Sequence, residues 1–368
     1  MNAVTETETS LSRQANDLAR DLLGANPRIY WPDLIATSIV TYAALWVTVT
    51  SASLGTALIA GAVCVLALYR GISFIHELTH VRSSELPAFH FAWNLLLGVP
   101  WLTPSLLYEG VHMLHHAKDR YGTEQDPEYH PLARRPLREL ALFLGIALLA
   151  PVGTMLRFAV LAPLGFLIPP VRRFAIAKTS AMQINPGFAR EDFERTVRAP
   201  WLAQEIGCWL WSWTLIGLTV AGVIPLRAVL IAAGIFSLMT FLNQLRTAVA
   251  HAWDNDGERT TFEGQFLDTV NVPPPALLPA LWAPVGLRYH ALHHLLPRVP
   301  YHNLATAHRR LVAAGSPVYR QVERRELGPA LAALVGKARA SQSLLFRGGV
   351  DREAVGVGKA GSGSELRD

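Results

Sequence analysis

Residues 34–69 read LIATSIVTYAALWVTVTSASLGTALIAGAVCVLALY, a run without one charged side chain. A membrane-spanning helix needs about 20 apolar residues, so this run is long enough for two spans that turn near 51–55. A second charge-poor stretch, 206–245, repeats the pattern with a turn around Arg227. Helix pairs buried in a soluble protein are rarely apolar on every face over this length. The sequence therefore predicts an all-α integral membrane protein with four transmembrane helices as two hairpins, at about 34–50, 55–75, 205–224 and 227–250.

The segment 137–170 is harder to place, because Arg157 lies near its middle and four prolines interrupt it. We expect interfacial or re-entrant helices there, with a third spanning hairpin as the alternative. The remaining division follows composition. Residues 1–30 are predicted to form a polar cytoplasmic N-terminal segment, 31–340 the membrane domain, and the glycine-rich residues 341–368 a flexible tail.

Lysine and arginine concentrate in 70–137, 171–200 and 252–368. By the positive-inside tendency, these segments and both termini face the cytoplasm, in a membrane that we expect to be the bacterial inner membrane. The formal net charge of +5 then requires no nucleic-acid partner, since basic residues beside lipid headgroups account for it. The first 20 residues lack the pattern of a cleavable signal peptide, and Cys64 and Cys208 suit apolar core positions.

Most of the 13 histidines fall into three clusters, HELTH at 76–80, HMLHH at 112–116 and HALHH at 290–294. Residues three or four apart on a helix share a face, so each cluster can direct its imidazoles toward one point. The first cluster and His251 follow predicted spans, where they can meet the other two at the membrane surface. Neutral imidazole suits iron, copper, zinc and nickel, and this many ligands exceed the capacity of one ion. We therefore predict a site for two metal ions, with the ligands His76, His80, His112, His115, His116, His251, His290, His293 and His294.

The order H-x-x-x-H, H-x-x-H-H and, after two further spans, H-x-x-H-H resembles the histidine boxes of membrane fatty acid desaturases and their hydroxylase relatives. The resemblance covers about 31–310. It implies a cytoplasmic helical cap that carries a di-iron site (Fe²⁺/Fe³⁺), O₂ as co-substrate, and an acyl-chain lipid substrate that reaches the site from membrane lipid. His251 resembles the extra ligand that many members supply after the last span. Since no electron-carrier module is recognisable in the chain, we expect a separate donor, ferredoxin or rubredoxin with its reductase.

Imidazoles bound to a metal usually donate their other N–H to a carboxylate or carbonyl. By proximity in sequence, the candidates for such partners are Glu77, Glu109, Asp119, Asp126, Asp254, Glu263 and Asp268. Of these we favour Asp119, Glu263 and Asp268. Thr247 stands where some members have an asparagine that approaches the metal through water, which puts that contact in doubt here.

Three readings of the chemistry compete. We predict a desaturase, which removes two hydrogens from an unactivated acyl chain, but a hydroxylase or other oxygenase of the same superfamily would carry the same boxes. HELTH alone would suit an intramembrane zinc peptidase with Glu77 as base, although zinc lacks redox chemistry and both H-x-x-H-H clusters would then have no role. A metal transporter would place its histidines within the spans rather than at their ends.

Overall fold

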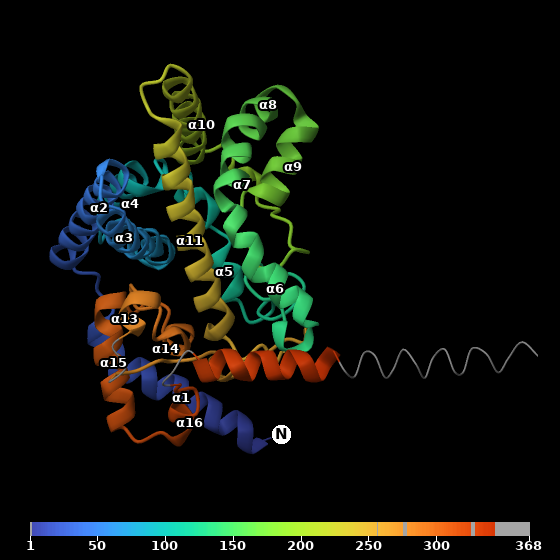
Figure 1. Cartoon of the computed structure of the whole chain (residues 1–368). Helices are drawn as coiled ribbons and strands as arrows, with labels where there is room; N and C mark the ends of the chain where they lie inside the picture. Colours follow the sequence, from blue (N-terminus) through green and yellow to red (C-terminus); the bar gives the residue numbers. More distant parts are fainter. Residues whose placement is uncertain (1, 256, 275–277, 325–327, 343–368) are drawn as a thin grey trace, which may run out of the picture.

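The computed structural model describes residues 2–255, 257–274, 278–324 and 328–342, and these residues form helices joined by loops, without a β-strand (Figure 1). The predicted flexible tail falls almost wholly outside them, because 343–368 are not described. The all-α class predicted from the sequence is confirmed.

The charge-free run 34–69 lies in a helical hairpin. Its helices are α2 (Pro27–Thr50) and α3 (Leu54–His80), and α2 packs along α3. The turn between them ends at Ser53, whose hydroxyl accepts a hydrogen bond from the Thr56 N–H and caps α3. Because α3 continues to His80, its last two turns include the first histidine cluster.

Within the described ranges, four helices are long and apolar enough to cross a membrane: α2, α3, the continuous helix 137–167, and α11 (Leu226–Ala250). The helix 137–167 consists of α6 (Leu137–Ile146), α7 (Ala150–Leu156) and α8 (Ala162–Leu167), joined by the 3₁₀ turn Ala147–Leu149 and the π-helical segment Arg157–Leu161. Two further helices, α9 (Pro169–Thr179) and α10 (Ala199–Val220), follow it.

This set, which rests on length and composition, differs from the expected spans at two places. The segment expected to be interfacial or re-entrant, with a third spanning hairpin as the alternative, contains the helix 137–167, which is long and apolar enough to span and in which Arg157 is buried. Conversely α10, expected to span at 205–224, falls outside the set and carries Gln204 and Glu205 in its first half. The path of the chain across a membrane and its cytoplasmic side remain predictions.

A helical cap lies at the opposite end from α8 and α10 (Figure 1). It gathers α1 (Asn2–Ala19), α13 (Pro279–Trp282), α14 (His290–Leu295), α15 (Tyr301–Ala313) and α16 (Pro317–Arg320). Leu11 and Ala15 of α1 pack into one apolar core with Leu292 and Leu311. The N-terminal segment is therefore a structural part of the cap. The short helices α4 (Phe89–Trp93), α5 (His112–His115) and α12 (Phe262–Leu267) complete the fold.

Candidate metal centre

The structure brings all nine predicted ligands together from four segments. The first pair comes from the end of α3, three come from α5 and the residue after it, His251 directly follows α11, and three come from α14. Eight of the nine are buried, and His80 is partly buried. Residues separated by more than 200 positions in the chain thus share one interior site.

The nine imidazoles divide into two groups, each with its ligand nitrogens within 4.8 Å of one another. We call them the five-histidine group and the four-histidine group. The five-histidine group contains His76, His80, His112, His116 and His293, and the four-histidine group contains His115, His251, His290 and His294. Each H-x-x-H-H cluster therefore contributes to both groups, because neighbouring residues on a helix point in different directions.

The spacing of the ring nitrogens fits metal ions. His116 Nε2 lies 3.0 Å from His112 Nε2 and 3.1 Å from His293 Nε2, and in the other group His290 Nε2 lies 3.0 Å from His251 Nε2. Nitrogens bound at right angles to one ion at about 2.1 Å would lie about 3.0 Å apart. Further ring nitrogens, on His76, His80, His115, His290 and His294, are buried without a hydrogen-bond partner among the described residues.

Burial also prepares these imidazoles as ligands. Burial, reinforced by the neighbouring imidazoles, lowers the pKa of His112, His116, His293 and His294 well below the ordinary value. These rings are therefore neutral at physiological pH, and a metal ion binds only neutral imidazole. The site needs no proton loss from these ligands to accept an ion.

Two carboxylates of the loop after the second cluster orient one imidazole in each group. His112 Nδ1 donates to Glu128 Oε1 at 2.7 Å, and Glu128 also accepts a bond from the Tyr108 hydroxyl at 2.7 Å. His115 Nδ1 donates to both oxygens of the fully buried Asp126, at 2.9 and 3.0 Å. Each contact directs Nε2 of the ring toward its own histidine group.

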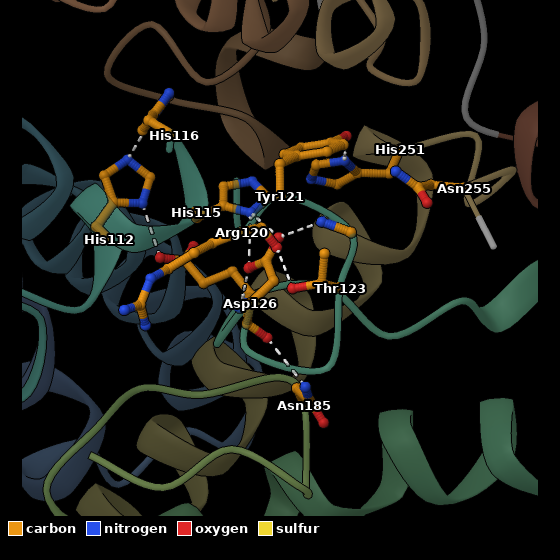
Figure 2. A network of polar contacts seen from close by, with 12 residues as sticks. His112, His115, His116, Arg120, Tyr121, Thr123, Asp126, Asn185, His251 and Asn255 are labelled. Atoms are coloured by element: carbon orange, nitrogen blue, oxygen red, sulfur yellow. Dashed lines mark hydrogen bonds and ion pairs between the residues drawn. The ribbon is translucent and has the colours of Figure 1, made fainter. Parts of the chain in front are cut away.

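The loop is folded around Asp126 (Figure 2). The Asp126 carboxylate accepts the backbone N–H groups of Gly122 and Glu128, both at 2.8 Å, and the Asn185 amide donates to the Asp126 carbonyl at 3.0 Å. Gly122 has a φ of +73°, and a Cβ there would lie 2.4 Å from the Asn255 side chain. Both observations favour glycine in the turn that carries Asp126.

His251 reaches a carboxylate through a tyrosine. Its Nδ1 donates to the Tyr121 oxygen at 3.1 Å, and the Tyr121 hydroxyl donates to Asp268 at 3.0 Å. Two backbone bonds hold the chain at this point, from the Ala252 N–H to the Asp268 carbonyl and from the Val270 N–H to the Ala250 carbonyl. The same segment thus fixes the backbone and the ring of His251.

Of the three carboxylates favoured from sequence proximity as partners of the imidazoles, one lies in the site and two do not. Asp268 lies in the site as described, Asp119 is exposed, and Glu263 lines a separate pocket with Arg13 and Lys118. Thr247 is buried beside the site, and its hydroxyl bonds to the Asn243 carbonyl one turn back. Glu128 was not among the candidates, because it lies 12 residues beyond the second cluster and only the folded loop brings it back.

Two further contacts anchor the first and third clusters. Asn271 is fully buried, and its Oδ1 accepts the Leu292 N–H at 3.0 Å, which fixes α14 between its histidines. Glu77 is buried and accepts the Tyr30 hydroxyl and the Tyr301 N–H, so it joins α2, α3 and α15. This placement gives Glu77 a structural role and removes the basis for a peptidase that would use it as base.

A cavity of about 420 Å³ lies between α3, α7, α11 and the chain after α9, and it reaches both histidine groups. Its wall includes His76 and His112 of one group and His251 and His290 of the other. Apolar side chains such as Ile72, Phe158 and Met239 line it further along, with several polar ones among them. The cavity suits a lipid chain that passes next to a metal site.

Comparison with known proteins agrees with this arrangement. A family model described as fatty acid desaturase matches residues 52–324. A ceramide hydroxylase of Caulobacter vibrioides (strain NA1000 / CB15N) is 58% identical over 312 residues, which cover 85% of this chain and 89% of that protein. Together with the metal-binding histidine clusters and the four apolar helices, these matches establish that the chain is an integral membrane protein that belongs to the fatty acid desaturase family.

Proposed function

We propose that this protein is an oxygen-dependent, di-iron membrane hydroxylase that acts on a ceramide-type lipid. The observation that carries the proposal is the 58% identity to a protein named as a ceramide hydroxylase, which extends over most of both chains. The cavity that leads an apolar chain to both histidine groups supports it, since a lipid carbon must lie beside the metal centre to be oxidised.

The prediction of a desaturase from the sequence is therefore wrong. Desaturases and hydroxylases of this family share the histidine boxes, so the boxes and the family match are compatible with either product. The similarity to a ceramide hydroxylase favours the alternative that the sequence left open, an oxygenase of the same superfamily. The expectation of an acyl-lipid substrate in a membrane is retained in this proposal.

In the proposed reaction, an alkyl C–H bond, O₂, two electrons and two protons give an alcohol and one water. Two iron ions held by the two histidine groups would supply the oxidising power that no side chain has. The protein's own groups hold the ligands in place: Glu128 and Asp126 fix His112 and His115, and Asn271 fixes α14. The cavity wall would position the lipid.

The electrons would come from ferredoxin or rubredoxin with its reductase. We place the metal centre and both termini on the cytoplasmic side of a bacterial inner membrane, where such donors are found. The distribution of lysine and arginine supports this orientation.

The test is mass spectrometry of lipids from a host that makes ceramide and expresses the protein. Growth under ¹⁸O₂ should place one labelled oxygen in ceramide, whereas desaturation would remove two hydrogens and add no label. The His293→Ala variant, which lacks a member of the five-histidine group, is the control and should give no product. Unlabelled ceramide with an added double bond would contradict the proposal.

A further inference from the structure

One face of α11 forms a wall of the cavity that reaches both histidine groups. The residues of α11 in this wall recur every three or four positions, as one face of a helix requires, and they include Phe236, Met239, Asn243, Arg246 and Thr247. At about 1.5 Å per residue, Phe236 lies about 21 Å along the helix from Ala250, which directly precedes the ligand His251. This wall of the cavity therefore runs from the metal centre to Phe236.

The polarity of this face changes along α11. Asn243 and Arg246, in the part near the metal centre, are polar and partly exposed. Met239 and Phe236, farther from the metal centre, are apolar and buried. A polar group that leaves water needs polar partners, whereas a hydrocarbon chain does not. A lipid in the cavity would therefore direct the end of a hydrocarbon chain toward Phe236.

A second, smaller cavity adjoins the first one at Phe236. It has a volume of about 210 Å³, and it shares two lining residues with the cavity at the metal centre, Phe236 of α11 and Thr154 of α7. Its other lining residues include Leu45 of α2, Leu215 of α10 and Ala233 of α11. We call this second cavity the apolar groove.

The apolar groove lies among helices that are long and apolar enough to span a membrane. Its wall draws on α2, α7 and α11, which belong to that set. The Trp211 Nε1 donates to the Pro100 carbonyl at 3.0 Å, so this polar atom of the wall is bonded within the protein. The Tyr42 hydroxyl likewise donates to the Leu96 carbonyl. The groove therefore suits hydrocarbon rather than a polar group.

The Phe236 side chain separates the two cavities. It is only 6% exposed and lines both of them. Its ring packs against the ring of Trp101, which lines the groove, with the ring centroids 6.1 Å apart. Side chains packed in this way are held in place by their neighbours. The ring of Phe236 therefore closes the cavity at its apolar end.

We propose that Phe236 sets the longest hydrocarbon chain that the cavity accepts. A chain that ends short of the ring fits between the metal centre and Phe236, and a longer chain overlaps the ring. One methylene too many in a hydrophobic pocket lowers kcat/KM by about 10-fold or more. The groove on the other side of the ring offers apolar space for the additional carbons once the ring is removed. The inference rests on the proposed function for its lipid class and adds the residue that selects the chain length.

The test uses ceramides in which either the acyl chain or the long-chain base is lengthened in steps of two carbons. The full-length iron-loaded protein in lipid nanodiscs is assayed for kcat/KM on each ceramide, and for binding of each by displacement of a radiolabelled ceramide. In one of the two series the wild type should lose about 10-fold between the longest accepted chain and the next one. The binding series decides the inference even if no ceramide is hydroxylated, in which case only the proposed function fails.

Two substitutions on the same face of α11 should differ. Phe236→Ala joins the cavity to the groove, so the loss at the wild-type length limit should shrink to less than about 2-fold and the limit should move to longer chains. Met239→Ala is the matched control, because Met239 lines the cavity but not the groove. It should widen the cavity and leave the length limit at the wild-type value.

Ala233 tests the inference from the side of the groove. It lines the groove but not the cavity, so Ala233→Phe alone should leave kcat/KM unchanged, and in the Phe236→Ala background it should restore the wild-type length limit. If Ala233→Phe alone lowers kcat/KM for every chain length, the groove is the entrance for the lipid and the inference fails.

Two other results would overturn it: a wild type without a length limit in either series, and a Phe236→Ala variant that keeps the wild-type limit. If Phe236→Ala fails to fold, Phe236→Leu removes less volume and decides instead, because it should move the limit in the same direction by a smaller amount.

Discussion

Asp126→Asn should release the ion of the four-histidine group and leave the other ion bound. Oδ2 of Asp126 accepts His115 Nδ1 and the Gly122 N–H, while Oδ1 accepts His115 Nδ1 and the Glu128 N–H. Whichever oxygen becomes NH₂, one backbone donor then faces another donor, and the charge that holds His115 is lost. Loss of such a partner lowers metal affinity by about 10-fold to 100-fold, or about 1.4–2.8 kcal/mol.

The assay is iron per chain after dialysis against a graded series of chelator concentrations. At a concentration that leaves the wild type with two irons, Asp126→Asn should retain about one. Glu128→Gln is the matched variant, since Glu128 contacts His112 of the five-histidine group, and it should also retain about one. The double variant should retain almost none.

The double variant distinguishes two separate ions from one shared ion. If Asp126 and Glu128 both acted on a single shared ion, the double variant would retain the same number of irons per chain as either single variant. That result, or a full complement of two irons in Asp126→Asn, would refute the assignment of one carboxylate to each histidine group.

Three further outcomes are expected. Tyr121→Phe removes the hydroxyl between His251 and Asp268, so iron affinity in the same chelator series should fall by about 10-fold with little change in the melting temperature of the metal-free protein. Asn271→Ala leaves the buried Leu292 N–H without its acceptor, so denaturant unfolding should show a loss of about 1–3 kcal/mol; an unchanged midpoint would contradict this. Removal of iron from the wild type should lower the melting temperature, and readdition of Fe²⁺ should restore it, because the ions bind the folded state.

The convergence of the histidines was predictable from the sequence because the spacing of a helix is local. His290, His293 and His294 lie on adjacent turns of α14, and their mutual placement follows from the helical repeat alone. The division into two groups was not readable, since it depends on how α5 and α14 are rotated against each other. Sequence spacing predicts that the imidazoles converge, but the packing of the helices decides which of the two groups each imidazole joins.

The carboxylates that orient His112 and His115 could not be assigned from the sequence. Asp126 was one of several acidic residues near the second cluster, and Glu128 lay beyond the range in which proximity was considered. Both reach the site because the loop turns back at Gly122, where a positive φ and the nearby Asn255 side chain favour glycine. A loop path of this kind has no periodic signal in the sequence, so the partners of His112 and His115 could be found only in the structure.

The segment expected to be interfacial and the helix α10 share a buried charge network. From the sequence, Arg157 argued against a helix through the membrane, because an isolated charge there is costly. In the fold, Glu205 of α10 is fully buried and pairs with Arg157, so the charge that weakened the case for the helix 137–167 has a buried partner. Arg172 pairs with the other oxygen of the same carboxylate. An arginine within an apolar stretch therefore argues against a spanning helix only where the fold offers it no buried partner, and the sequence does not show that Glu205, 48 positions away, supplies that partner.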